Sequence, residues 1–216
     1  LAVPKTKKGE KGGFAVMVTK DGIIKKVDAS SFENVRRSGL IAITLKKDDT
    51  LRWAKLTGGG DELILVTKRG QAIRFAEKDI RAMGRQAAGV HAVRLKKGDE
   101  VVGMNAIAES TKHKLQSTKL LVVMENGYGK QTLIKNYKKQ KRGGSGIKTA
   151  KVTPKTGAVV GAAIVGEEEE ELIAISRKGQ VIRTTLSTIP ILGRATQGVR
   201  IMRLDSGESV ASITTL

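Results

Sequence analysis

The sequence predicts an all-β fold, built as a propeller-like array of four-stranded units. Four segments of the 216-residue chain align on a glycine turn between two short strands. No segment keeps a 3.6-residue periodicity long enough to compete with these short alternating runs, so helices are not expected. Four-stranded repeats of about 50 residues are typical of arrays in which radial repetition protects the sheet edges.

Each repeat is anchored by two glycines. The hairpin glycines are Gly22, Gly70, Gly127 and Gly179, at spacings of 48, 57 and 52 residues. A second glycine follows 17 residues later in the first repeat and 19 residues later in the others: Gly39, Gly89, Gly146 and Gly198. Independent loops would not keep this register. We expect one domain over residues 1–216, with repeats at roughly 14–57, 63–108, 120–166 and 172–216, and with residues 1–3 ending a preceding blade.

The four strands of a repeat follow in the same order each time. In the second repeat an apolar run, Leu63–Val66, precedes the hairpin turn, and an alternating run from Ala72 follows it. A loop then leads to a third strand at Val90–Leu95 and an apolar fourth strand at Val101–Ile107. The fourth repeat has its third strand at Val199–Leu204 and its fourth at Val210–Ile213. Glycine and aspartate turns bound these runs, as expected for strands.

Two segments interrupt the repeats. Residues 109–118 lengthen the loop between the second and third repeats and predict a flexible surface excursion. Five consecutive acids, Glu167–Glu171, separate the third and fourth repeats. They are either a solvated loop or an intramolecular competitor for a basic surface, since acidic blocks often act in that way.

The charge balance indicates a polyanionic partner. Lys and Arg number 40 against 21 Asp and Glu, a net charge of +19. Nucleic acid is the first candidate partner and an anionic membrane surface the second. The absence of Cys excludes disulfides and thiol catalysis and fits a reducing compartment. No apolar run approaches the roughly 20 residues of a membrane helix, so no membrane-spanning segment is expected. With nucleic acid as the preferred polyanion, we expect a cytoplasmic protein that does not bind membranes.

The basic residues concentrate in the loop before the second glycine of each repeat. These four segments, here called the arginine loops, are Asn34–Leu40, Ala82–Val90, Lys138–Ile147 and Ile191–Val199. Arginine can hold phosphate in a bidentate fork, and amides freed by nearby glycines can meet phosphate oxygens. The predicted DNA-binding residues are Arg36, Arg37, Arg85, Lys138, Lys139, Gln140, Lys141, Arg142, Gly143, Gly144, Gly146, Lys148, Arg194 and Arg200.

Further basic residues on the hairpins and third strands are either secondary contacts or ordinary solvated side chains. They include Lys25, Lys26, Lys68, Arg69, Arg74, Arg94, Lys96, Lys97, Lys130, Arg183 and Arg203. Aromatic residues make up only 3% of the chain, so base stacking on single strands is poorly supported. Phosphate contact on duplex DNA with little base readout fits better.

The sequence shows no catalytic constellation. It contains neither a GxxxxGK[ST] phosphate loop nor a GxGxxG run, and its two histidines, His91 and His113, are isolated. No Ser/His/Asp triad can be recognised. Tyr128 and Tyr137 occupy positions at which other repeats carry non-nucleophilic residues. We therefore expect a non-catalytic chain without a metal or cofactor.

With the repeats laid out, the chain resembles the C-terminal domain of the DNA gyrase A protein. The runs that carry the resemblance include KRGQAIRF, MGRQAAGVHAVRLKKGDEVVGM, ENGYGKQT and RKGQVIRTTLSTIPILGRATQGVRIMRL. The family implies a β-pinwheel, in which neighbouring blades exchange strands and a basic rim wraps duplex DNA in a positive sense. It also implies that the domain works with the remainder of gyrase A and with gyrase B in ATP-dependent negative supercoiling. Gln140–Gly146, QKRGGSG, matches the family's seven-residue box but lies in the third repeat here.

Two alternatives stay open. The equivalent domain of topoisomerase IV has the same architecture and would select DNA crossings instead of wrapping DNA. A propeller that serves as a protein-interaction platform would bind acidic proteins without changing DNA topology.

Overall fold

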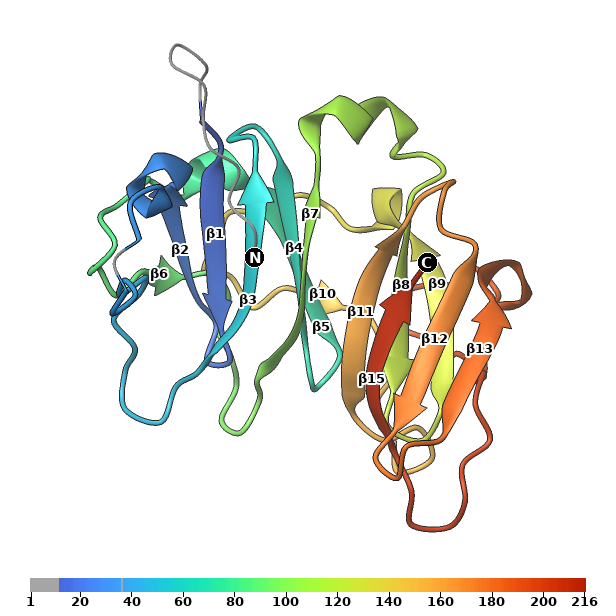
Figure 1. Cartoon of the computed structure of the whole chain (residues 1–216). Coiled ribbons are helices and arrows are strands. Elements are labelled where there is room, and N and C mark those ends of the chain that lie inside the picture. Colours follow the sequence, from blue (N-terminus) through green and yellow to red (C-terminus); the bar gives the residue numbers. More distant parts are fainter. Residues whose placement is uncertain (1–11, 36) are drawn as a thin grey trace.

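The computed structural model describes residues 12–35 and 37–216, apart from the side chains of residues 112 and 113. Residues 1–3, expected to end a preceding blade, and Arg36, a predicted DNA-binding residue, lie outside the described part. Within that part the chain forms fifteen strands and five short 3-10 helices, with no α-helix (Figure 1). The all-β prediction is confirmed.

The strands form four antiparallel sheets. The first has the order β3–β1–β2–β6, from β1 (Phe14–Thr19), β2 (Ile23–Asp28), β3 (Leu51–Thr57) and β6 (Val90–His91). The second has the order β10–β5–β4–β7, from β4 (Glu62–Thr67), β5 (Gln71–Ala76), β7 (Val101–Ile107) and β10 (Ile147–Lys148).

The third sheet has the order β11–β8–β9–β14, from β8 (Lys119–Met124), β9 (Tyr128–Leu133), β11 (Val159–Val165) and β14 (Val199–Arg200). The fourth has three strands in the order β13–β12–β15, from β12 (Glu171–Ser176), β13 (Val181–Thr185) and β15 (Val210–Thr215). The 3-10 helices η1 (Ala29–Phe32), η2 (Glu77–Asp79), η4 (Ile134–Asn136) and η5 (Leu186–Thr188) each follow the second strand of a repeat, and η3 (Glu109–Lys114) lies in the inserted loop.

Each of the first three sheets is completed by a strand from the following repeat. β6 of the second repeat pairs with β2, with Ile24 opposite Val90. In the same way β10 of the third repeat pairs with β5, and β14 of the fourth pairs with β9. The strand exchange that the family resemblance implied is therefore present.

The predicted third strands were too long. Val90–Leu95 was expected as a strand, but only Val90–His91 pairs with a neighbour. Beyond this point the amides bond to turns instead: the Ala92 amide donates to Gly22 O at 2.9 Å, and the Arg94 amide donates to Gly144 O at 2.8 Å. Val199–Leu204 shortens to Val199–Arg200 in the same way.

The first repeat also lacks the third strand that was expected of every repeat. Its corresponding residues, 40–45, form no strand in the described structure. Each third strand joins the preceding sheet, and the described residues include no sheet before the first.

The second glycine of a repeat permits the exchange of strands. Gly146 has φ of +71°, and a Cβ at this position would lie 2.6 Å from the carbonyl oxygen of Ala72 in the neighbouring sheet. Gly89 and Gly198 are in the same situation, facing Ile24 O at 2.7 Å and Gly129 O at 2.5 Å. Only glycine allows the two backbones to approach this closely while φ is positive.

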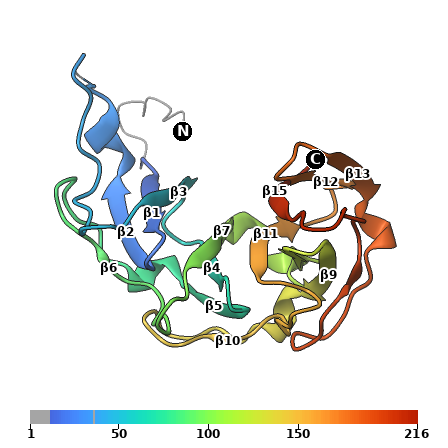
Figure 2. The same ribbon diagram turned by 90° about the horizontal axis from the view of Figure 1, so that it is seen from below.

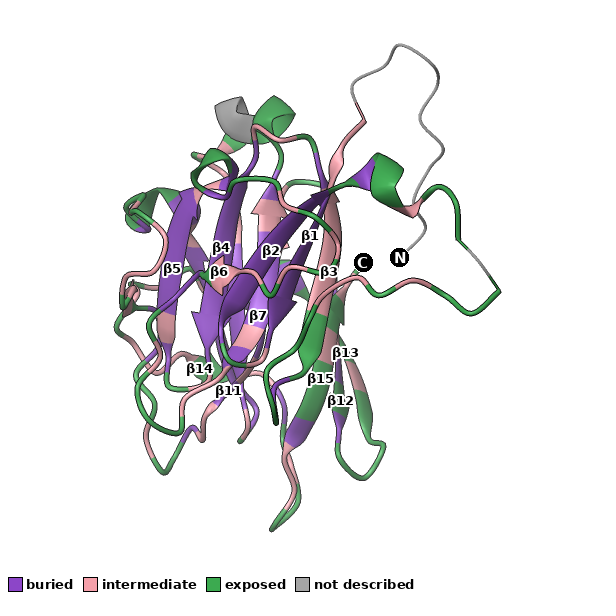
Figure 3. Cartoon of the chain, turned by 90° about the vertical axis from the view of Figure 1, so that its left-hand side faces the viewer, coloured by how far each residue is buried: buried purple, intermediate pink, exposed green. Residues whose placement is uncertain are grey.

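The core consists of three apolar layers, one between each pair of neighbouring sheets. The sheets stand around an arc, with β7 and β11 in contact on its inner side and with β6 and β10 on its outer side (Figure 2). All six residues of β4 are buried because sheets cover both of its faces, whereas none of the five residues of β13 is (Figure 3). In the described residues, no helix has the length and apolar character needed to cross a membrane.

Candidate nucleic-acid interface

The second to fourth arginine loops are built alike. Each first touches the outer strand of the preceding sheet in a parallel bridge, joining Ala82 to Lys26, Lys139 to Arg74 and Ile191 to Gln131. Each loop then turns away and returns to the same strand as the antiparallel β6, β10 or β14. Its turn is therefore fastened at both ends to the outer edge of the sheet.

Hydrogen bonds along this edge also join each loop to the residues that follow the loop of the preceding repeat. The Thr44 amide donates to Ala87 O at 3.4 Å, and the Thr44 hydroxyl donates to Gln86 O at 2.6 Å. The Gly143 amide donates to Ala92 O at 2.7 Å, and the Lys151 amide donates to Thr196 O at 2.9 Å. The turns of successive repeats thus form one connected strip.

Arginines occupy the same position in three of the loops. Arg85, Arg142 and Arg194 each lie four residues before the second glycine of their repeat and are half-buried. Arg142 donates through Nε to Asp79 O at 3.0 Å and through Nη1 to His91 O at 3.1 Å. Arg194 makes the matching contact, from Nη1 to Lys148 O at 3.3 Å. Each of these two guanidiniums also braces the neighbouring repeat and keeps at least three of its five N–H donors for a ligand.

The first repeat departs from this pattern. Its loop is two residues shorter, so Arg37 lies only two residues before Gly39 and is exposed. It extends the basic strip without occupying the position shared by the other three arginines.

The lysines of the third loop have different surroundings. Lys138 and Lys141 are exposed. The ammonium of Lys139 lies 2.6 Å from Glu62 Oε1, and Arg74 Nη2 lies 2.6 Å from the other oxygen of that carboxylate. Arg74 also donates to Ile134 O and Tyr137 O. Lys139 therefore belongs to an ion-pair network between the second and third repeats, although its side chain is half exposed.

The short third strands contribute two exposed cations, both of them predicted DNA-binding residues. Lys148 of β10 and Arg200 of β14 both face solvent. Arg200 Nη2 lies 3.4 Å from the Tyr128 hydroxyl, and its guanidinium stands 5.6 Å from the centre of that ring. The hydrogen bond from Arg200 lowers the pKa of Tyr128.

Four of the secondary basic residues are buried rather than solvated: Lys25, Lys26, Arg74 and Lys130. All four lie on second strands, where strand alternation alone would assign some of them to an exposed face. Their burial arises because the next repeat covers the outer edge of the sheet. Lys25 and Lys130 contact its arginine loop, whereas Lys26 and Arg74 contact residues at its 3-10 helix. This burial could not be predicted from the strand's own residues, because the residues that bury these side chains belong to another repeat.

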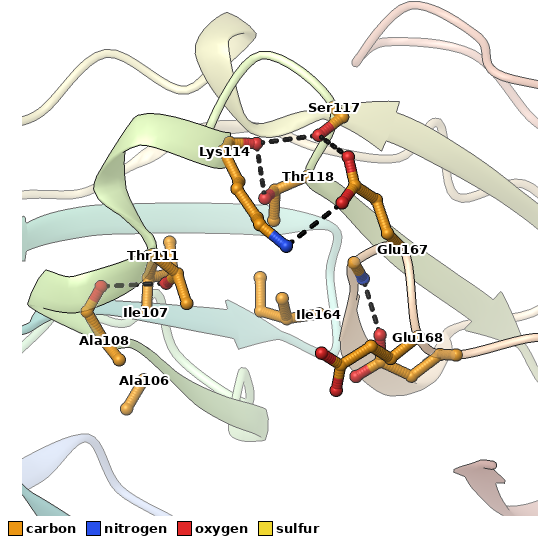
Figure 4. A pocket seen from close by; sticks show the side chains of 12 residues that line it. Ala106, Ile107, Ala108, Thr111, Lys114, Ser117, Thr118, Ile164, Glu167 and Glu168 are labelled. Carbon is orange, nitrogen blue, oxygen red and sulfur yellow. Dashed lines mark hydrogen bonds and ion pairs between the residues drawn. The ribbon is translucent and has the colours of Figure 1, made fainter.

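The acidic run lies away from the arginine loops, at the end of the sheets that is uppermost in Figure 1. The Glu167 carboxylate accepts from Ser117 and lies 3.1 Å from the Lys114 ammonium of the inserted loop (Figure 4). Glu171 pairs with Arg183 at 2.5 Å. These two acids thus hold basic residues outside the arginine loops, which favours a local structural role over competition for the basic strip. The inserted loop itself contains η3, and the buried Thr118 at its end accepts the Ile134 amide at 2.9 Å.

No group of three His, Cys, Asp or Glu side chains that could hold a metal ion gathers among the described residues. The most distinctive feature of the outer edge of the sheets is the row of cationic side chains on the arginine loops.

The family to which the chain is similar agrees with this architecture. The family model described as "DNA gyrase C-terminal domain, beta-propeller" matches residues 14–57, 61–108, 119–166 and 170–216. The chain is 41% identical over 202 residues to the DNA gyrase A protein of Haloquadratum walsbyi, and 40% identical over 200 residues to that of Staphylococcus epidermidis. These alignments cover 94% and 93% of this chain but only 23% and 22% of the relatives.

Solved structures show the same fold. A structure of the DNA gyrase A C-terminal domain superimposes with a TM-score of 0.82 at 27% identity, covering 97% of this chain and 68% of that one. The C-terminal domain of DNA topoisomerase IV superimposes with a TM-score of 0.88 at 24% identity, covering 98% and 64%, which supports the fold alone. With all four repeats matched by the family model, the chain belongs to the family of DNA gyrase C-terminal domains.

Proposed function

We propose that this domain binds duplex DNA along the arginine loops and wraps it around the outer edge of the arc. The observation that carries the proposal is the connected strip of turns, in which Arg85, Arg142 and Arg194 recur at one position in consecutive repeats. A regular row of cations on a curved edge matches the regular row of phosphates on a bent duplex. The net charge of +19 would draw such a polyanion to the surface.

The proposed contacts divide into two kinds. Arg37, Arg85, Arg142, Arg194, Lys138, Lys141, Lys148 and Arg200 would bind phosphates with their side chains. Gln140, Gly143, Gly144 and Gly146 would shape the turn of the third loop and bring its backbone close to the DNA. Lys139 would contribute less than its neighbours because Glu62 already neutralises it. Such contacts position DNA without reading its sequence.

The role in a whole protein follows from the family. We infer that the domain is a non-catalytic part of a gyrase A protein, acting in the bacterial cytoplasm with the remainder of gyrase A and with gyrase B. Positive wrapping by the domain would present a neighbouring DNA segment for strand passage and so support negative supercoiling driven by ATP. The second candidate is the equivalent domain of topoisomerase IV, which shares this fold.

Ligation of nicked circular DNA tests the proposal. The circles are sealed with increasing amounts of the domain, and the sign of the linking-number change is read after protein removal. A positive change that disappears at high salt is expected. Tight binding with no change in linking number would contradict wrapping by these four repeats and favour the topoisomerase IV function.

Substitution of the third arginine loop tests whether this loop causes the wrapping. Changing Lys139, Lys141 and Arg142 together to Ala removes charges from the densest part of the strip. Wrapping a site of 20–30 bp requires roughly 1–6 kcal/mol of bending energy, so this variant is expected to bind DNA but lose the linking-number change. Unaltered wrapping would exclude a role for that loop.

A further inference from the structure

Two lysines on second strands are buried completely, with no exposed side-chain surface. They are Lys25 in β2 and Lys130 in β9, each three residues after the hairpin glycine of its repeat. Neither ammonium has a carboxylate partner within the part of the chain that the structure describes. A buried charge without a counterion is costly unless backbone dipoles replace water around it, so the groups around these ammoniums are informative.

Three of the four carbonyls that supply these dipoles belong to the arginine loop of the next repeat. Lys130 Nζ donates to Gly193 O and Arg194 O, both at 2.5 Å. Lys25 Nζ donates to Arg85 O and, at 2.9 Å, to Ala42 O. Each lysine therefore holds the carbonyl of the arginine that occupies the shared position of the strip.

This contact sets the direction of the neighbouring amides. In a planar trans peptide the N–H points opposite to the C=O, and no cis peptide is present in the described chain. With the carbonyls of Gly193 and Arg194 turned toward Lys130, the amides of Arg194 and Ala195 face away from it. Neither amide donates to another protein group among the described residues. Successive amides with a common direction form an anion-binding concavity.

The second sheet shows that the fold does not require a lysine here. Ile73 occupies the corresponding position in β5, three residues after Gly70. The third arginine loop, which packs over Ile73, is fastened through its own backbone: Gly143 donates to Ala92 O, and Gly144 accepts the Arg94 amide. An apolar side chain is thus accommodated at this position, and the lysine is specific to the second and fourth arginine loops.

We propose that Lys130 is a positioning residue that fixes a phosphate-binding corner, made by the amides of Arg194 and Ala195 and by the Arg194 guanidinium. At the corresponding corner, Lys25 holds the Arg85 carbonyl alone and so directs only the Gln86 amide. The phosphate is that of the DNA backbone, so this inference rests on the proposed function. The ammonium also lies behind the corner as a second positive charge, and burial together with the nearby Arg194 lowers the pKa of Lys130 to about 8.

Lys130→Ile tests the role of the lysine and copies the side chain already present at position 73. Amide hydrogen exchange in the absence of DNA should accelerate by about tenfold or more at Leu192 and Lys151, whose amides bond to Gln131 O and to Thr196 O of this loop. Exchange of the Thr44 amide, which bonds to Ala87 O of the second arginine loop, should not change. Affinity for a short duplex should fall by roughly 10- to 150-fold, the effect of losing one charge-assisted bond. Lys135→Ile removes the same charge from an exposed position on η4 and should change affinity less than about twofold. Should Lys130→Ile unfold, Lys130→Met keeps the length of the side chain and allows the same measurements.

A double-mutant cycle separates positioning from simple charge loss. If Lys130 acts through the corner, the losses from Lys130→Ile and Arg194→Ala should overlap, so that the double variant binds little worse than Arg194→Ala alone. Losses that multiply would show that Lys130 is an independent charge and would overturn the positioning role. Unchanged exchange at Leu192 and Lys151 would overturn it whatever the DNA result. A wild-type domain that does not bind DNA would instead refute the proposed function, and with it the phosphate-binding role of the corner.

Discussion

The contact between Gly146 and the neighbouring sheet offers a sharp test of how the repeats are joined. Gly146→Ala adds a single carbon, yet this carbon would lie 2.6 Å from Ala72 O and 2.9 Å from Ala72 C. Both are backbone atoms inside a sheet and cannot swing aside as the end of a side chain could. The strand must therefore move away from β5.

The magnitude follows from two contributions. A non-glycine residue at positive φ costs about 1–2 kcal/mol. Displacing β10 weakens its two-residue pairing with β5 and the bond from the Thr149 amide to Gly70 O at 2.8 Å, at about 1 kcal/mol for each hydrogen bond lost. Together we expect a loss of about 3–5 kcal/mol in the free energy of unfolding.

Gly39→Ala is the matched control. Gly39 has a similar φ of +76°, but nothing lies within 4 Å of its added carbon. It should cost at most about 1–2 kcal/mol. Urea unfolding of both variants measures the difference, and hydrogen exchange at Thr149 shows whether β10 has been released. Equal destabilisation by the two substitutions would refute the argument that strand exchange requires this close approach.

Three further predictions concern charged residues. Burial pushes the pKa of Glu62 upward, but hydrogen bonds from Lys139 and Arg74 outweigh it and hold the pKa below its ordinary value. The stability that this lowered pKa provides is present at neutral pH and is lost as pH falls through it. Glu62→Gln should lower the free energy of unfolding by about 3–5 kcal/mol at pH 7, and it should reduce the dependence of the unfolding temperature on acidic pH. Lys141→Ala should weaken duplex binding with little change in urea stability, whereas Lys139→Ala should mainly lower stability, and the reverse order would contradict the assignment of Lys139 to the ion-pair network. Lys130 faces Arg194 and two carbonyls, and bound DNA should favour its charged form. Duplex affinity should therefore be full below pH about 8 and should fall as pH rises through that value. Lys130→Ile should abolish this fall in affinity.

Much of the fold could be predicted because its signals are local. The hairpin and second glycines keep a common register along the chain. Gly89, Gly146 and Gly198 are required at their positions because each packs against a backbone carbonyl oxygen of the neighbouring sheet. The apolar first and fourth strands were identified because their burial leaves uninterrupted hydrophobic runs. The arginine loops were found because charge and glycine recur together in the sequence.

The candidate site was only partly predictable. Arg85, Arg142 and Arg194 lie at one repeated position, which the register shows. The sequence could not predict that Lys139 is paired while Lys141 is exposed, because the partner of Lys139, Glu62, lies in another repeat. Lys130 looked like an ordinary strand lysine, and its burial depends on a loop more than 60 residues further along the chain.

The sequence by itself determined the number of repeats, their glycine register, the all-β class and the concentration of positive charge in four loops. These properties depend on residue type and spacing along the chain. The tertiary structure alone decided which sheet receives each third strand, which cations remain exposed and which are enclosed. The reason is physical: a strand's own pattern specifies which of its faces is apolar, but the segment that covers its edge comes from the next repeat, and only close packing of the two backbones selects it.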